Sequence, residues 1–182
     1  ELSHSQAWHA GDRLGIEWGV EERSYDTRYD YHGDAERSFV LVSPGAMPAE
    51  SLRRLERFVE ARHASAWALQ RSSPVEALTL EIGLRFDRHD LTDDSLWSPR
   101  LLAAWRTGES TVVRAGWGVF HQSQRPYELQ VEDGEEEFAR AERSLQITLG
   151  IDHFFRRSGP LRALRAELYR RDVREPRRRF EN

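Results

Sequence analysis

The stretch from Leu78 to Phe120 constrains the fold most, because apolar residues recur in it at every second position. The first run consists of Leu78, Leu80, Ile82, Leu84 and Phe86. The residues between them are small, polar or charged, and a period of two is typical of a β-strand rather than a helix. Two more runs, 97–105 and 113–119, repeat the pattern on either side of a turn at 107–110. We therefore predict three antiparallel strands with one apolar face and one charged face.

Such a sheet has two interpretations, which place opposite faces in water. In a soluble sandwich or barrel the apolar face forms the core, whereas in an outer-membrane barrel it contacts lipid and the charged face lines the lumen. Trp97 and Trp105 lie eight positions apart on the apolar face, which is roughly 27 Å along a strand that rises about 3.3 Å per residue. Tryptophan is favoured at both membrane interfaces. The spacing therefore favours the membrane interpretation.

The segments around these strands resemble the C-terminal part of the barrel of TonB-dependent outer-membrane receptors. The resemblance is carried by Ser98-Pro99-Arg100 at the start of one strand, Arg114-Ala115-Gly116-Trp117-Gly118 within the next, Glu128 to Glu135 in the loop beyond, and later LGIDHFF and LRAELYRRDVREPRRRFEN. It covers about residues 60–182 well and the first sixty weakly. It implies an all-β fold, an antiparallel up-and-down transmembrane β-barrel segment that occupies the whole chain, 1–182.

The resemblance also implies a function and a location. Receptors of this kind lie in the cell outer membrane and import a scarce ligand such as a siderophore, cofactor or glycan in an energised process. Their plug domain and the motif that engages TonB precede the barrel, and neither is found in this sequence. The implied partners are outer-membrane lipid, the missing plug, TonB through that plug, and a small-molecule ligand of unknown identity. We expect no enzyme activity and no cofactor.

Composition agrees with this interpretation. Only 38% of the 182 residues are apolar and the mean hydropathy is -0.74, so no run approaches the roughly twenty apolar residues that a membrane-spanning helix needs. Cysteine is absent, which excludes disulfides and cysteine metal sites. The net charge of -4 argues against a nucleic-acid partner. The pattern is already under way at Glu1, so we expect a fragment or a processed product.

Alternation elsewhere predicts about eight strands. They begin near Leu2, Leu14, Ala64, Leu78, Trp97, Val113, Leu145 and Leu161. Residues 35–60 break the period and predict an external loop, in which Pro48 would start a short helix carrying Leu52, Leu55 and Val59. Ser72 to Val75 is predicted as a short turn.

Short and long connections alternate along the chain, as they do between the periplasmic and external ends of an outer-membrane barrel. This asymmetry would place Trp105 near the periplasm and Trp97 near the outside. Eight strands can close only a narrow barrel with a filled interior, and many long charged side chains would be costly there. We therefore predict a curved sheet cut from a larger barrel, with unpaired first and last strands.

The alternation assigns individual residues to the two faces. The candidates for the lumen are Arg13, Glu17, Glu21, Glu81, Arg85, Arg100, Arg114, Arg165 and Glu167. The candidates for the lipid-facing aromatic girdles are Trp18, Trp67, Trp97, Trp105 and Trp117. We interpret neighbouring opposite charges on the lumen face as cross-strand pairs rather than acid and base catalysts.

Catalytic and metal-binding motifs are not recognisable in the sequence. The seven histidines are scattered, and none lies in a metalloprotease or nucleophile motif. Two acidic clusters, Asp26/Asp30/His32/Asp34 and His89/Asp90/Asp93/Asp94, could bind a hard cation, but acidic loops are mostly solvated, so no metal site is assigned. Two alternatives remain open: a soluble β-rich ligand-binding module, and an outer-membrane hydrolase barrel.

Overall fold

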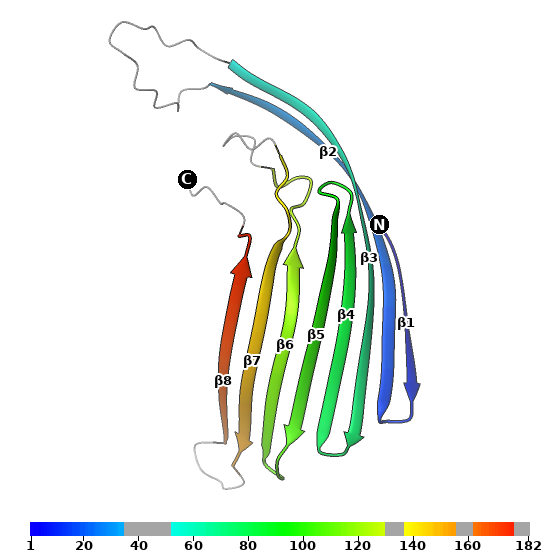
Figure 1. Cartoon of the computed structure of the whole chain (residues 1–182), viewed down its shortest axis with the longest axis vertical. Coiled ribbons are helices and arrows are strands. Elements are labelled where there is room, and N and C mark those ends of the chain that lie inside the picture. The colour runs from blue at the N-terminus through cyan, green and yellow to red at the C-terminus, as the bar shows by residue number, and fades with distance from the viewer. Residues whose placement is uncertain (35–51, 130–136, 156–161, 177–182) are drawn as a thin grey trace, which may run out of the picture.

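The computed structural model describes residues 1–34, 52–129, 137–155 and 162–176. Eight strands form one antiparallel sheet in which each strand pairs with its neighbours in sequence (Figure 1). The strands are β1 (Leu2–Ala10), β2 (Leu14–Asp34), β3 (Leu52–Val75), β4 (Leu78–His89), β5 (Asp94–Arg106), β6 (Thr111–Gln122), β7 (Glu142–Phe154) and β8 (Ala163–Arg174). The predicted all-β, up-and-down arrangement of eight strands is confirmed.

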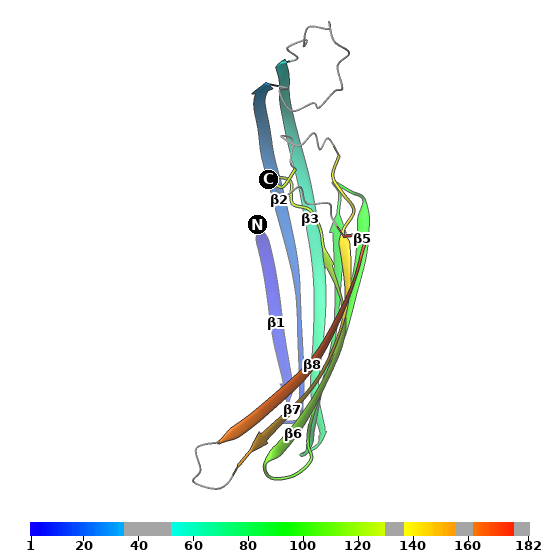
Figure 2. The same cartoon turned by 90° about the vertical axis from the view of Figure 1, so that its left-hand side faces the viewer.

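The sheet is a single curved layer (Figure 2). Within the described residues β1 and β8 each pair on one side only, and no pairing joins them. The open sheet predicted from strand number is therefore what the structure shows. Among the described residues no large side chain is fully buried, because a single layer has no second layer to form a core against. None of the described residues belongs to a helix long and apolar enough to cross a membrane.

The two ends of the sheet differ in their connections. At the lower end in Figure 1, β1 and β2 are joined by residues 11–13, β3 and β4 by 76–77, and β5 and β6 by 107–110. At the upper end residues 123–141 separate β6 from β7. The turn before β4 was predicted at Ser72 to Val75, and this is wrong. The strand continues to Val75 through a register irregularity after Ser72.

The largest departure from the sequence prediction is an extension of β2 and β3. Residues 52–60, predicted as loop and short helix, belong to β3 instead, while residues 35–51 lie outside the described part of the chain. Beyond Glu22 and Arg62, β2 and β3 pair only with each other and rise above the other strands as a hairpin ribbon (Figure 1). The helix prediction failed because continuous pairing with β2 satisfies the backbone there.

Candidate functional site

The strand register places eight of the nine predicted lumen residues on one face, which we call the charged face. Residues directly opposite in a sheet share a face, and the pairs Glu17–Leu69, Leu69–Gly83 and Gly83–Arg100 connect four strands on this side. The residues on it are Glu17, Glu21, Glu81, Arg85, Arg100, Arg114, Arg165 and Glu167. Arg13 is the exception, because it lies exposed in the turn before β2, where its carbonyl accepts a hydrogen bond from the Ser73 amide (2.8 Å).

The opposite face, which we call the apolar face, carries four of the five predicted girdle tryptophans. Trp97 pairs with Phe86, and Trp105 pairs with Leu78 and Val113. Trp18 and Trp117 lie on the same side. Trp97 is 57% exposed and Trp105 is 55% exposed, so no other part of the described chain covers them. This face is a broad apolar surface without a partner in the structure.

Trp67 is a correction to the girdle prediction, because it lies on the charged face. It pairs with Gly19 on one side and Arg85 on the other. A Cβ built on Gly19 would lie 2.8 Å from the Trp67 ring nitrogen, so the indole occupies the space that the absent side chain leaves. Leu69, two positions after Trp67 on the same strand, lies on the charged face too. Small residues, Ala66 and Ala68, take the apolar side of β3.

In the lower half of the charged face, opposite charges pair across strands. The Asp152 carboxylate forms ion pairs with Arg114 and with Arg165, whose Nε lies 2.7 Å from Oδ1. Glu81 lies 3.6 Å from the guanidinium of Arg71 directly opposite it. Glu81, Arg114 and Glu167 also line a hollow of about 260 Å³. The interpretation of such charges as cross-strand pairs holds for these residues.

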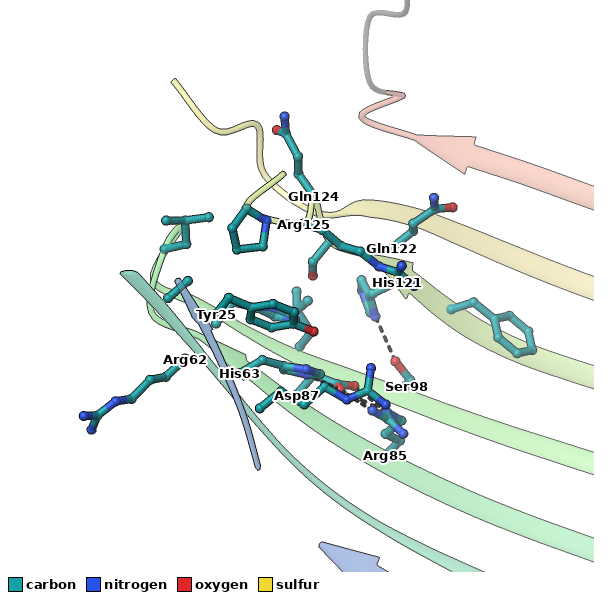
Figure 3. Close-up of a pocket in the computed structure, with 18 of the residues that line it drawn as sticks. Tyr25, Arg62, His63, Arg85, Asp87, Ser98, His121, Gln122, Gln124 and Arg125 are labelled. Atoms are coloured by element: carbon teal, nitrogen blue, oxygen red, sulfur yellow. Dashed lines mark hydrogen bonds and ion pairs between the residues drawn. The ribbon is translucent and has the colours of Figure 1, made fainter. Parts of the chain in front are cut away.

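Near the upper end of the sheet the charged face forms a larger hollow, the rim cavity, of about 560 Å³ (Figure 3). Strands β2 to β6 and the loop after β6 contribute to its wall. Polar and charged lining residues are Arg23, Tyr25, Arg62, His63, Arg85, Asp87, His89, Ser98, Arg100, His121, Gln122, Ser123, Gln124, Arg125 and Glu128. The structure thus brings the predicted lumen residues Arg85 and Arg100 into one site.

Asp87 is the centre of the polar contacts in the rim cavity. The Arg85 guanidinium donates to both of its carboxylate oxygens at 2.8–3.0 Å, and the His63 Nε2 atom lies 2.9 Å from Oδ1. Glu21 lies 4.0 Å from the same guanidinium. Asp87 is buried, and a buried carboxylate is stable only when charge and hydrogen bonds compensate its desolvation.

The loop after β6 covers part of the cavity and is attached to the hairpin ribbon. The Tyr29 hydroxyl donates to the Pro126 carbonyl and accepts a hydrogen bond from the Leu129 amide (3.1 Å). The side-chain amide of Gln124 donates to the Glu128 carbonyl (3.2 Å), and its oxygen accepts from the Ala139 amide (2.8 Å). The contact between Tyr29 and Leu129, which are 100 positions apart, therefore joins the loop to the ribbon at one wall of the cavity.

The charge of the lining favours an anionic ligand. The arginines are Arg23, Arg62, Arg85, Arg100 and Arg125, against the carboxylates of Asp87 and Glu128. The Arg62 side chain extends away from the others (Figure 3), Arg85 is paired with Asp87, and Arg23 is paired with Glu21. Guanidinium groups bind carboxylate and phosphate-like oxygens through forked hydrogen bonds.

A serine and a histidine are in contact in the same cavity. The Ser98 hydroxyl lies 3.0 Å from Nδ1 of His121. A nucleophile of the serine class requires a base whose second nitrogen is oriented by a third group. Within the described residues no hydrogen bond to Nε2 of His121 is present, so the contact lacks that third member.

Several residues of the site could not be identified from the sequence. His63, Asp87 and Tyr29 were not among the predicted lumen residues, although Asp87 shares the parity of Arg85. Among the described side chains neither acidic cluster gathers three potential metal ligands, whereas His63, Asp87 and His89 do. His63 and His89 are 26 positions apart, and only the register of β3 against β4 makes them opposite neighbours.

Comparisons with known proteins agree with this geometry. The family model described as "TonB dependent receptor-like, beta-barrel" matches residues 2–175. Crystal structures of the ferric enterobactin receptor PfeA, one in complex with BCV-L6 and one of the Q482A mutant from Pseudomonas aeruginosa in complex with enterobactin, superpose with TM-scores of 0.63 and 0.64 at 19% identity. A search of curated proteins gives no match.

The solved receptor chains are much longer than this chain. The comparison covers 94% of this chain but only 26% of each receptor chain, so the chain spans about a quarter of their length. The family consists of outer-membrane receptors and transporters and is not a class of enzymes. Because the family model matches nearly the whole of it, this chain belongs to the TonB-dependent receptor β-barrel family.

Proposed function

We propose that the chain forms a section of the barrel wall of an outer-membrane receptor that takes up a small anionic ligand. One observation carries the proposal: a single-layer sheet has a continuous exposed apolar face and, on its other face, an arginine-rich cavity at the end where residues 123–141 connect β6 to β7. A soluble module would have to cover the apolar face, because large exposed apolar surfaces are rare in soluble monomers.

In this proposal the apolar face contacts lipid and the charged face lines the lumen. Trp97 and Phe86, whose rings lie 4.7 Å apart, would form part of the outer aromatic girdle, and Trp105 part of the inner one. The plug that fills the lumen in such receptors, and TonB acting through it, would be partners of the whole receptor.

The ligand would enter at the rim cavity. A positively charged recess with low-dielectric walls attracts anions and raises their local concentration. Arg100 is well placed for this, because the absence of a side chain on Gly83 leaves room for its guanidinium to lie across the sheet; a Cβ there would lie 2.6 Å from Nε. Siderophores are one candidate class, since both solved structures are of a receptor named for ferric enterobactin.

The test is a binding assay on the receptor that contains this chain, with a panel of iron chelates of different net charge, ferric enterobactin among them. Anionic chelates should bind more tightly than neutral or cationic ones, and Arg100→Gln should weaken the binding of the anionic chelates several-fold. Arg71→Gln, on the same face outside the rim cavity, serves as the matched control. Equal affinity across the panel, or equal loss in the two variants, would contradict the proposal.

A further inference from the structure

Two histidines form a directly opposed cross-strand pair at the top of the charged face. His63 on β3 is the register partner of His89 on β4, and their rings are stacked with centroids 4.0 Å apart and planes 8° from parallel. Asp87 lies two residues before His89, on the same face of the same strand. One potential ligand atom from each of these three residues lies within 4.8 Å of the other two.

We propose that His63, Asp87 and His89 bind a divalent transition-metal ion of the Zn²⁺ or Cu²⁺ class. Two imidazoles and one carboxylate suit first-row metals of intermediate softness, and they leave further coordination positions open to water or another ligand. This site goes beyond the proposed uptake function and does not depend on it, because it needs no imported ligand.

The geometry requires only side-chain adjustment. Ligands about 2.0 Å from a tetrahedral Zn²⁺ lie roughly 3.3 Å from one another. The ligand atoms in the structure lie within 4.8 Å of one another, so rotation about the side-chain bonds of the histidines must bring them closer. The rings must also leave their parallel stack, since a metal lies near the plane of each imidazole that binds it. The backbone can stay in place, because the ligands come from adjacent strands with a fixed register.

The hydrogen-bond network already contains a support for the carboxylate. Oδ1 of Asp87 contacts His63 and also accepts from Nη2 and Nε of Arg85 at 2.8 and 3.0 Å, while Oδ2 accepts from Nε at 2.9 Å. A metal bound by Oδ1 would displace the guanidinium from that oxygen and leave it on Oδ2. Such outer-shell partners orient a ligating carboxylate in metal sites.

Neighbouring carboxylates offset the positive charge of Arg85. Asp94 pairs with His89 across β4 and β5, and Asp90 follows His89 directly in sequence. Burial of the His89 ring and the neighbouring His63 disfavour a positive charge on His89, and both carboxylates favour one. Asp94 is itself held in place, because its Oδ2 accepts from the Thr92 hydroxyl (2.7 Å) and the Ala141 amide (3.2 Å). Asp87, Asp90 and Asp94 therefore place negative charge beside the two histidines, within a rim cavity whose other charged groups are mostly arginines.

The experiment uses the receptor that contains this chain, purified in detergent without a polyhistidine tag and without any chelate ligand. Zn²⁺ binding is measured by calorimetry for the wild type, His63→Gln and His89→Gln. His9→Gln is the matched control, because His9 lies on the same face at the opposite end of the sheet. Loss of an outer-shell partner alone costs about 10- to 100-fold in affinity, so each ligand variant should lose at least tenfold while the control keeps the wild-type value.

A second measurement does not depend on variants folding. Cu²⁺ added to the wild-type receptor should give an electron paramagnetic resonance spectrum with hyperfine coupling to two imidazole nitrogens. Absence of Zn²⁺ binding by the wild type, unchanged binding in both ligand variants, or a Cu²⁺ spectrum without coupling to nitrogen would each overturn the proposal. Failure of the charged-chelate assay would leave these outcomes unaffected, which separates the two proposals.

Discussion

The lower sheet and the rim of this chain are built on different physical rules. In the lower sheet, from the turns up to the Phe86–Trp97 pair, every strand alternates between two environments, and neighbouring strands repeat the same division. At the rim, contacts join segments far apart in sequence, such as Tyr29 with Leu129, which are 100 positions apart. The lower sheet is thus determined by a local period, whereas the rim depends on long-range register.

The largest expected effect is in the lower sheet. Leu84→Arg places a charge in the middle of the apolar face, and in a transmembrane barrel this should cost about 2 to 4 kcal/mol near the membrane midplane. Arg100→Gln, on the charged face of the neighbouring strand, should cost much less. The free energy of unfolding of the receptor in lipid bilayers measures both. Equal costs at the two positions would remove the distinction between the faces.

A smaller effect is expected where Trp67 packs over Gly19. Gly19→Ala places a Cβ against the indole and 3.0 Å from the His4 carbonyl oxygen, so we expect a loss of about 1 to 3 kcal/mol, as for other overpacked sites. Gly108→Ala is the control, since a Cβ there has no atom within 4 Å. Adding Trp67→Leu to the Gly19 variant should recover part of the loss. An outward-facing Trp67 would give no such coupling.

The smallest effect is expected at the rim. Tyr29→Phe removes two hydrogen bonds to the loop after β6, each worth about 0.5 to 1.5 kcal/mol net. Loop opening should become easier, while global unfolding should barely change, because the lower sheet does not use these bonds. Hydrogen exchange at the Leu129 amide measures loop opening, and unfolding in lipid bilayers measures global stability. Tyr169→Phe, at an exposed position on β8, is the control; a large global loss in Tyr29→Phe would show that rim and sheet unfold together.

The same division explains what the sequence could predict. Leu78 to Phe86 and the runs after it predicted the strands and which of their residues share a face, because period-two alternation is a local property. The helix proposed to include Val59 failed because residues 52–60 pair continuously with β2, and pairing between segments distant in sequence is not a local property.

Side-chain placement was less predictable than strand placement. Trp67 was assigned outward because large apolar residues favour the apolar face, but the room left by Gly19 on the charged face decides its position. Arg13 continues the alternation of β2 in sequence, yet it falls in the turn. The rim cavity and the histidine pair depend on register, and a one-residue slip in register would exchange every face.

The central claim, that the apolar face meets lipid and the charged face meets water, can be measured along β4. This chain has no cysteine, so once any cysteines elsewhere in the receptor are replaced, single cysteines at Glu81, Ile82, Leu84 and Arg85 can each carry a nitroxide spin label in the bilayer-embedded receptor. Relaxation of the label by collision with a reagent measures its access to that reagent. We expect labels at positions 82 and 84 to collide mainly with oxygen, which concentrates in lipid. Labels at positions 81 and 85 should collide mainly with a water-soluble nickel chelate. The reverse pattern, or access to the nickel chelate at all four positions, would contradict the account.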